Sequence, residues 1–166
     1  NLSFPGLFTQ TPPYQLDVEV QKHLDGLLEK VARAGLYAVI SFRTGPGRTE
    51  HSFSDATSTS ANKVWKSKTA QDAWVKMWEF TAQRYAHHPT VIGYHLMVEP
   101  NGNMMVPNGW DGKAFFKNYG KSLHNWHLLA DRISKAIRSI DEATPILVSS
   151  MNWGDPLWLD YVPVNY

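Results

Sequence analysis

Several features are missing from this sequence of 166 residues, and each absence excludes a class of protein. It contains no cysteine, which excludes disulfides, zinc–thiolate sites and cysteine nucleophiles. The 16 basic and 15 acidic residues leave a formal net charge of +1, which gives no reason to expect a nucleic acid or an anionic membrane as a partner. No apolar run approaches the roughly 20 residues that a membrane-spanning helix requires.

The composition is otherwise that of a globular protein, at 43% hydrophobic and 19% charged residues. The length suits a single domain over residues 1–166 with a substantial core. Aromatic residues make up 13% of the chain, and most of them are expected to fill that core. Trp110 and Trp153 fall in expected loops instead, where stacking on a sugar ring and ordinary loop packing explain them about equally well.

The hydrophobic pattern predicts helices and strands in alternation. Helices are expected over Asp17–Ala34, from Thr69 to before Pro89, near Ala114 and over Leu123–Glu142; strands are expected over Leu36–Phe42, Val91–Glu99 and Pro145–Ser149; and Asn1–Tyr14 and Met151–Tyr166 are expected to be loops. Alternation of this kind implies a parallel sheet, and the near-continuous apolar strands agree with it.

Signals for helix ends support these boundaries. Asp17 is expected to cap the first helix, and Gly35 to end it in a left-handed conformation. The second helix is expected to begin near Thr69, with Asp72 three residues later as a variant of the capping box.

Loop lengths favour a (β/α) barrel over a doubly wound sheet. Only Gly35 separates the first helix from its strand, whereas the polar stretch after Arg43 runs for roughly 25 residues, which indicates a functional loop. Functional loops follow the strands in (β/α) barrels. A doubly wound sheet remains an alternative, although no G-x-G-x-x-G follows any expected strand.

Glu99 is the strongest candidate for chemistry. It ends an apolar strand, and Pro100 prevents the strand from continuing. The carboxyl edge of a parallel sheet is where such folds carry out reactions. Arg43 ends the neighbouring expected strand, so its guanidinium should lie near Glu99. A structural ion pair and a functional acid explain this pair about equally well.

The histidines give weaker signals. His95 is either a partner of Glu99 or a buried, hydrogen-bonded strand residue, and the second interpretation is favoured. His124 and His127 lie in helical segments without a third ligand at a recognisable spacing, so no metal site is expected. Neither Ser149 nor its neighbour lies in a G-x-S-x-G motif.

Three segments resemble glycoside hydrolase family 5, the cellulase-like (β/α)8 enzymes. Val91–Pro100 is similar to the fourth-strand signature, in which an Asn-Glu-Pro triplet ends the strand. Leu36–Gly47 resembles the third strand and its loop, and Pro145–Trp153 resembles the fifth strand. The resemblance implies an α/β fold that is a partial (β/α)8 TIM barrel, roughly strands 3 to 5 with their helices in a parallel sheet.

The resemblance also implies a retaining endo-β-glycanase that acts on β-linked polysaccharides or glycosides without a cofactor. Glu99 matches the general acid/base, whereas the nucleophile of the family, on strand seven, would lie outside this chain. Val98 stands where the family has Asn, and Arg43 where many members have His. The cleft is expected to be lined by Arg43, Asn101, Trp110 and Trp153. The isolated chain is expected to have little or no activity.

Two alternatives remain open from the sequence. The chain could be a non-catalytic carbohydrate-binding module, or a partial barrel that pairs its open edges with another copy or with a complementing barrel fragment. Because polysaccharide hydrolases are usually exported, a secreted or extracytoplasmic location is expected.

Overall fold

The computed structural model describes residues 2–162, and the side chains of residues 5–162. One sheet contains four parallel strands in the order β1 (Leu2–Phe4), β2 (Ala38–Phe42), β3 (Val91–His95) and β4 (Ile146–Leu147). The helices are α1 (Val18–Arg33), α2 (Lys68–Tyr85), α3 (Gly112–Tyr119), α4 (Trp126–Arg138) and the short α5 (Met151–Gly154). Short 3₁₀-helices span Glu50–Phe53, Lys63–Trp65, Gly102–Met105 and Pro156–Tyr161.

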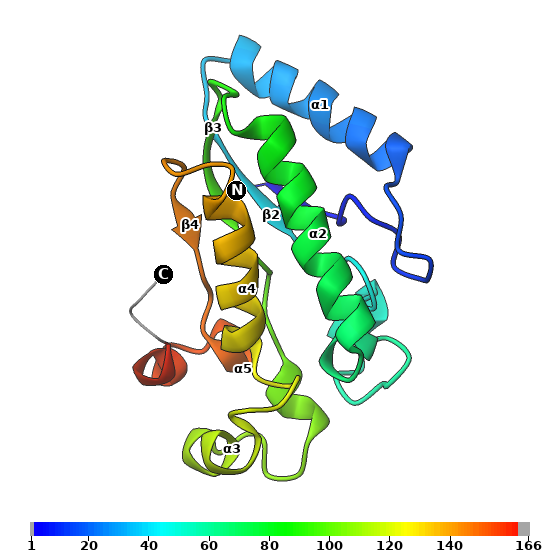
Figure 1. The fold of residues 1–166 in the computed structure, drawn as a ribbon, viewed down its shortest axis with the longest axis vertical. Helices are drawn as coiled ribbons and strands as arrows, with labels where there is room; N and C mark the ends of the chain where they lie inside the picture. The colour runs from blue at the N-terminus through cyan, green and yellow to red at the C-terminus, as the bar shows by residue number, and fades with distance from the viewer. Residues whose placement is uncertain (1, 163–166) are drawn as a thin grey trace.

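The sequential strand order with helical crossovers is the arrangement expected of part of a (β/α) barrel. Helices α1, α2 and α4 lie along one side of the sheet, while α3 and α5 lie beyond the carboxyl ends of the strands (Figure 1). Among the described residues, no helix covers the opposite face of the sheet. The expected α/β class and parallel sheet are therefore confirmed.

Trp78 on α2 joins the helical layer to the sheet. Its side chain is fully buried, with ring centroids 4.7 Å from Phe42 on β2 and 5.8 Å from Tyr94 on β3. Its indole N–H donates to the carbonyl oxygen of Leu96 at 3.0 Å. One side chain therefore fixes α2 against two strands and against the segment that leads to Glu99. The expected apolar face of this helix, Trp74, Trp78, Thr81 and Tyr85, is buried throughout.

The structure confirms both predicted helix starts and corrects the cap of the second helix. Asp17 caps α1 by accepting from the backbone N–H groups of Glu19 and Val20, and Gly35 has a φ of +69° directly after the helix. Helix α2 begins at Lys68, so its predicted start near Thr69 is confirmed, but the predicted capping box with Asp72 is wrong. Ser67 caps this helix through a bond from the N–H of Ala70, because its short hydroxyl reaches the first turn of the helix.

The strands are shorter than predicted, and one was missed. Leu2–Phe4 form β1 rather than a loop, while Asn1 lies outside the described residues. Three residues before a proline are too few to show strand periodicity. The predicted strand Val91–Glu99 ends at His95, and Pro145–Ser149 contributes only Ile146–Leu147.

Strand β4 is also not fully buried, although its sequence is apolar, because Leu147 lies 45% exposed on the uncovered face. The last long helix ends at Arg138 instead of Glu142. The predicted C-terminal loop contains α5 and a 3₁₀-helix as far as residue 162, and its last four residues lie outside the described part. Within that part, no helix is both long and apolar enough to cross a membrane.

Replacing Trp78 with alanine should lower the free energy of unfolding by about 3–5 kcal/mol, because it removes a large buried ring and leaves the carbonyl of Leu96 without its donor. Glu79→Ala, an exposed neighbour on the same helix, should change it by less than about 0.5 kcal/mol. Urea unfolding followed by circular dichroism measures both. Equal losses in the two variants would contradict this account of the core.

Candidate active site

Glu99 lies just beyond the carboxyl end of β3. Its backbone has a φ of +50°, a left-handed conformation that is costly for a residue with a Cβ and that persists only where the surroundings hold it. Its side chain is 46% exposed, and its Oε2 lies 3.9 Å from Nη1 of Arg43. The predicted proximity of Arg43 and Glu99 is therefore confirmed.

Arg43 is shared between two carboxylates and an aromatic ring. Its Nε donates to Oε2 of Glu50 at 3.0 Å, and its guanidinium carbon lies 3.6 Å from the centroid of the Phe53 ring. Exposed ion pairs contribute at most about 1 kcal/mol each. The arrangement therefore orients Arg43 and Glu99 more than it stabilises the fold, and it leaves the carboxylate of Glu99 accessible to solvent.

A second arginine, Arg48, lies beneath this pair and is fully buried. Its Nη1 donates to the carbonyl oxygens of Val98 at 2.6 Å and of Arg43 at 3.2 Å, and its Nη2 donates to the carbonyl of Glu99 at 2.6 Å. Burial lowers the pKa of Arg48 to about 9, and the negative charge of Glu99 opposes that shift. The side chain thus remains a cation at neutral pH.

Arg48 was not identified from the sequence. Its signal was the run Gly45-Pro-Gly-Arg48, in which the residues at both ends exchange backbone hydrogen bonds at 2.9 and 3.0 Å to form a tight turn. Gly47 has a φ of +68°, and the indole of Trp74 donates to the carbonyl of Pro46 at 2.8 Å. Such a turn holds its last side chain in one place.

Trp153 lies beside this cluster of side chains. Its ring centroid is 5.9 Å from that of Phe53, and its backbone N–H donates to the carbonyl of Pro100 at 3.1 Å, one residue after Glu99. Asn152 and Trp153 both have positive φ values, of 55° and 65°. A strained main chain therefore keeps a half-buried indole next to the turn that contains Glu99.

The remaining cleft residues expected from the sequence lie elsewhere. Asn101 is fully buried; its Oδ1 accepts from the indole of Trp65 at 3.0 Å and its Nδ2 donates to the hydroxyl of Ser52 at 3.4 Å. The prediction that Asn101 lines the cleft is therefore wrong in this conformation, because its amide has no access to a ligand. Trp110 is 72% exposed and forms no ring contact or side-chain hydrogen bond within the described chain.

His95 links three neighbouring segments across the uncovered face of the sheet. Its Nδ1 shares a hydrogen bond of 2.8 Å with the hydroxyl of Ser41, and its Nε2 shares one of 2.7 Å with the hydroxyl of Ser149. Burial lowers the pKa of His95, so the neutral ring is favoured. Both ring nitrogens are engaged by serines, which supports the favoured interpretation as a hydrogen-bonded strand residue rather than a partner of Glu99.

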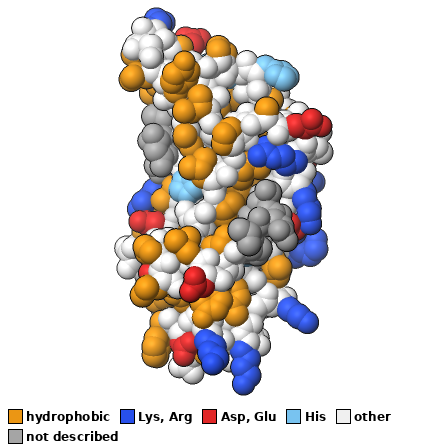
Figure 2. Space-filling model, turned by 90° about the vertical axis from the view of Figure 1, so that its left-hand side faces the viewer, with side chains coloured by type: hydrophobic (Ala, Val, Ile, Leu, Met, Phe, Trp, Pro, Cys, Tyr) orange, Lys and Arg blue, Asp and Glu red, His pale blue; other side chains and the backbone are white. Residues whose placement is uncertain are grey.

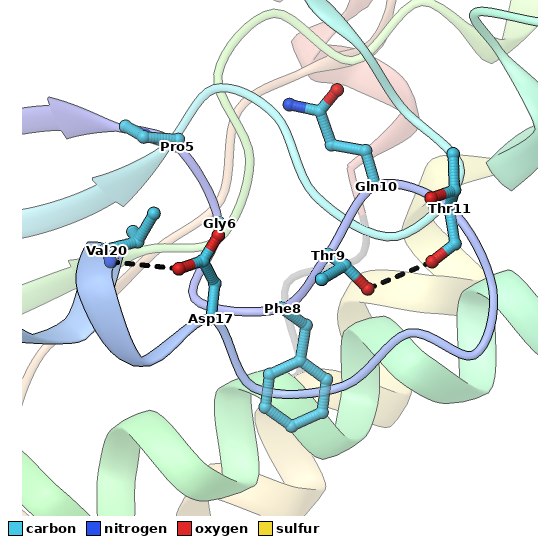
Figure 3. Close-up of a pocket in the computed structure, with 8 residues that line it drawn as sticks. All are labelled: Pro5, Gly6, Phe8, Thr9, Gln10, Thr11, Asp17 and Val20. Atoms are coloured by element: carbon cyan, nitrogen blue, oxygen red, sulfur yellow. Dashed lines mark hydrogen bonds between the residues drawn. The ribbon is translucent and has the colours of Figure 1, made fainter.

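A separate hollow of about 310 Å³ lies at the start of α1, lined by Pro5, Gly6, Phe8, Thr9, Gln10, Thr11, Asp17 and Val20 (Figure 3). The only ionisable group in that lining is Asp17, whose carboxylate already caps α1. The hollow therefore has fewer groups suited to catalysis than the cluster at Glu99. In the described part of the chain, no three acidic or histidine side chains are grouped so that they could hold a metal ion.

Comparison with known proteins points to one family. The family model described as cellulase, glycosyl hydrolase family 5, matches residues 1–161. An endoglucanase of Paenibacillus polymyxa is 28% identical over 130 residues, which are 78% of this chain and 27% of that protein. A β-xylosidase of Phanerodontia chrysosporium is 33% identical over 88 residues, which are 53% of this chain and 18% of that protein.

Solved structures agree on the fold. The complex of Thermotoga maritima Cel5A with cellobiose superposes with a TM-score of 0.64 at 21% identity, over 98% of this chain and 42% of that chain. The chain thus spans less than a third of these curated relatives and about two-fifths of this structural neighbour. This likeness confirms the fold class, a part of a TIM barrel.

Because folding lowers the pKa of His95, the unfolded chain binds a proton below about pH 6.5 that the folded chain binds only at lower pH. The free energy of unfolding should therefore fall as the pH drops below about 6.5, and His95→Gln should make this fall less steep. Urea titrations at several pH values measure the difference between the variants, while His124 and His127 contribute equally to both. Identical slopes would contradict the assignment.

Proposed function

Since the chain belongs to the cellulase family, glycosyl hydrolase family 5, we propose that it carries the acid/base half of a retaining β-glycosidase site, with Glu99 as the proton donor. The observation that carries the proposal is the position of Glu99. An accessible carboxylate lies at the carboxyl edge of a parallel sheet, 3.9 Å from Nη1 of Arg43, and the backbone N–H of Trp153 donates to the carbonyl of the next residue, Pro100. This edge is where TIM barrels place their reactive groups.

In the proposed reaction, Glu99 first protonates the glycosidic oxygen that leaves, and the same carboxylate then removes a proton from the attacking water. A retaining mechanism needs a second carboxyl group about 5–5.5 Å away as the nucleophile. Glu50 is held by Arg43, and Asp155 binds the amide of Asn152 and caps the following 3₁₀-helix. We therefore propose that the nucleophile comes from outside this chain.

The substrate that this site fits best is a β-linked polysaccharide cut internally, as in an endoglucanase. Trp153 offers a flat apolar surface to a sugar ring, and the exposed indole of Trp110 offers a second one. Arg43 can donate hydrogen bonds to sugar hydroxyls. Val98 replaces the amide that binds a sugar hydroxyl in the family pattern, so affinity at this point should come from stacking and from Arg43.

The acid/base role predicts a dependence on the leaving group. In a product of this gene that hydrolyses β-glucan, Glu99→Gln should lower kcat on the glucan by about 10²–10⁴, the usual contribution of a general acid. Dinitrophenyl β-glycosides need no proton on their leaving group, so their first step should be slowed far less. Equal losses on both substrates would contradict the role of Glu99.

Hydrolysis by the 166-residue chain alone should be weak or absent, and robust turnover would contradict the proposal that the nucleophile comes from outside this chain.

A second candidate function is carbohydrate binding without catalysis, favoured by Val98 beside Glu99 and by the 72% exposure of Trp110. Two results together would select carbohydrate binding over hydrolysis. The gene product should turn over neither β-glucan nor dinitrophenyl β-glycosides, and it should bind cellotetraose with an affinity that Trp110→Ala or Trp153→Ala weakens.

The uncovered face of the sheet favours self-association of the isolated chain. Apolar side chains gather on the face that lies at the left of Figure 1, where β3 and β4 are found (Figure 2). Strand β4 presents an unpaired edge within the described residues, and Leu147 on it is 45% exposed. Open edges and exposed apolar patches are surfaces on which copies associate.

The chain should accordingly form dimers or larger species in light scattering at high concentration. Leu147→Glu should reduce this association, because it places a charge on the uncovered face. Leu128→Glu is the matched control, since Leu128 on α4 is 46% exposed on the helical side. A wild-type chain that stays monomeric, or equal effects of the two substitutions, would overturn this prediction.

A further inference from the structure

We propose that Arg48 is the positioning residue of Glu99, a proposal that rests on the function proposed above. Arg48 is fully buried, so it touches neither solvent nor substrate. Its guanidinium instead holds the carbonyl groups of Val98 and Glu99, which belong to the peptide units before and after the Cα of Glu99. It therefore acts on the reaction through the backbone that carries the acid.

The hydrogen bonds of Arg48 are concentrated where β3 has already ended. The carbonyls of Val98 and Glu99 each accept from it at 2.6 Å, the shortest distances that this arginine makes. Beyond β3, the ladder can no longer fix these residues, although the N–H of Val98 still donates to the carbonyl of Phe42 at 3.0 Å. The left-handed conformation of Glu99 needs such support, because it is costly for a residue with a Cβ.

An ordinary ion pair does not explain Arg48. Arg84 binds the carboxylate of Asp25, and Arg132 binds that of Asp72, whereas the hydrogen bonds of Arg48 within the described chain all go to carbonyl oxygens. Its Nε is buried without a hydrogen-bond partner there, and its guanidinium carbon lies 4.6 Å from the centroid of the Phe53 ring. Burying a guanidinium is costly, so an arginine here has to be explained by what it holds.

The turn that presents Arg48 is itself fixed from several sides. The N–H of Gly47 donates to the carbonyl of Gln10 at 2.9 Å, and the carbonyl of Gly47 accepts from Val64 at 3.0 Å. A Cβ on Gly47 would lie 2.9 Å from the backbone nitrogen of Val64. Arg48 therefore fixes the position of Glu99, beyond the end of β3, relative to the loop that follows β2. Reacting groups need to be held within about 0.5 Å of their productive position, which such a link can achieve.

The test uses the 166-residue chain and three variants. Arg48→Met removes the charge and all three side-chain hydrogen bonds, while Arg48→Lys keeps a charge and can retain one of the bonds. Arg138→Met is the matched control, because Nη1 of Arg138 also donates to two carbonyls, those of Asp141 and Thr144, both at 2.9 Å. Two-dimensional NMR reports the conformation of Glu99 through the strong amide–Hα Overhauser effect within the residue that a positive φ produces. Titration with cellotetraose reports binding.

Arg48→Met should lose the Overhauser signature of Glu99 and weaken cellotetraose binding by about tenfold, the order expected when a functional group is no longer held in place. Arg48→Lys should recover part of both. Arg138→Met should leave the Glu99 signature and the affinity unchanged. A folded Arg48→Met with the full wild-type signature would overturn the proposal. If Arg48→Met does not fold, an Arg48→Lys variant with the full wild-type signature and affinity would overturn it instead.

The two proposals fail in different ways. If the gene product neither binds nor hydrolyses a β-glucan, the proposed function fails, while the Overhauser signature of Glu99 still decides the role of Arg48. If cellotetraose binds and the signature survives in both Arg48 variants, only the positioning role is overturned.

Discussion

A guanidinium taken out of water needs acceptors, and both Nη atoms of Arg48 find them in carbonyl oxygens rather than carboxylates. The consequence is geometric, because carbonyls belong to the main chain and cannot turn away as a carboxylate can. The turn after β2 and the turn after β3 therefore behave as one unit. The exposed part of the site, Glu99 with Arg43 above the Phe53 ring, is built on that unit.

The transition from ladder to loop explains why such a unit is needed. Parallel strands align their residues only as far as they pair, and β3 stops at His95, four residues before the acid. Beyond that point the order comes from individual bonds: the indole of Trp78 to Leu96, the N–H of Trp153 to Pro100, and Arg48. These bonds come from three different parts of the chain. The acid is thus positioned by the sheet and by the loops around it.

The arrangement of helices and strands could be predicted wherever the sequence repeats hydrophobic residues at a regular spacing. Periodicity gave the alternation of helices and strands, and the rule that parallel strands share an edge gave the approach of Arg43 to Glu99. Sequence patterns could not predict β1, which is only three residues long. They also could not predict which polar loop residues form hydrogen bonds inside the protein. Asn101 and Arg48 show the difficulty, because both fall in predicted loops and both are fully buried. Burial in an irregular segment depends on contacts with distant residues such as Trp65 and Val98, which no local pattern encodes.

Val98 and Glu99 lie in the same bend after β3, and Arg48 binds the carbonyls of both residues. These carbonyls belong to the peptide units before and after the Cα of Glu99, so the main chain on either side of Glu99 is held whichever side chains the two residues carry. The side chain at position 98 is therefore free to change without moving the acid. A valine there removes one hydrogen-bonding group for sugar, but it leaves the proposed proton donor in place. In our proposal, the chain thus keeps the chemistry of the acid and leaves recognition of the sugar to Arg43 and to the indole of Trp153, which the strained turn at Asn152 and Trp153 holds beside it.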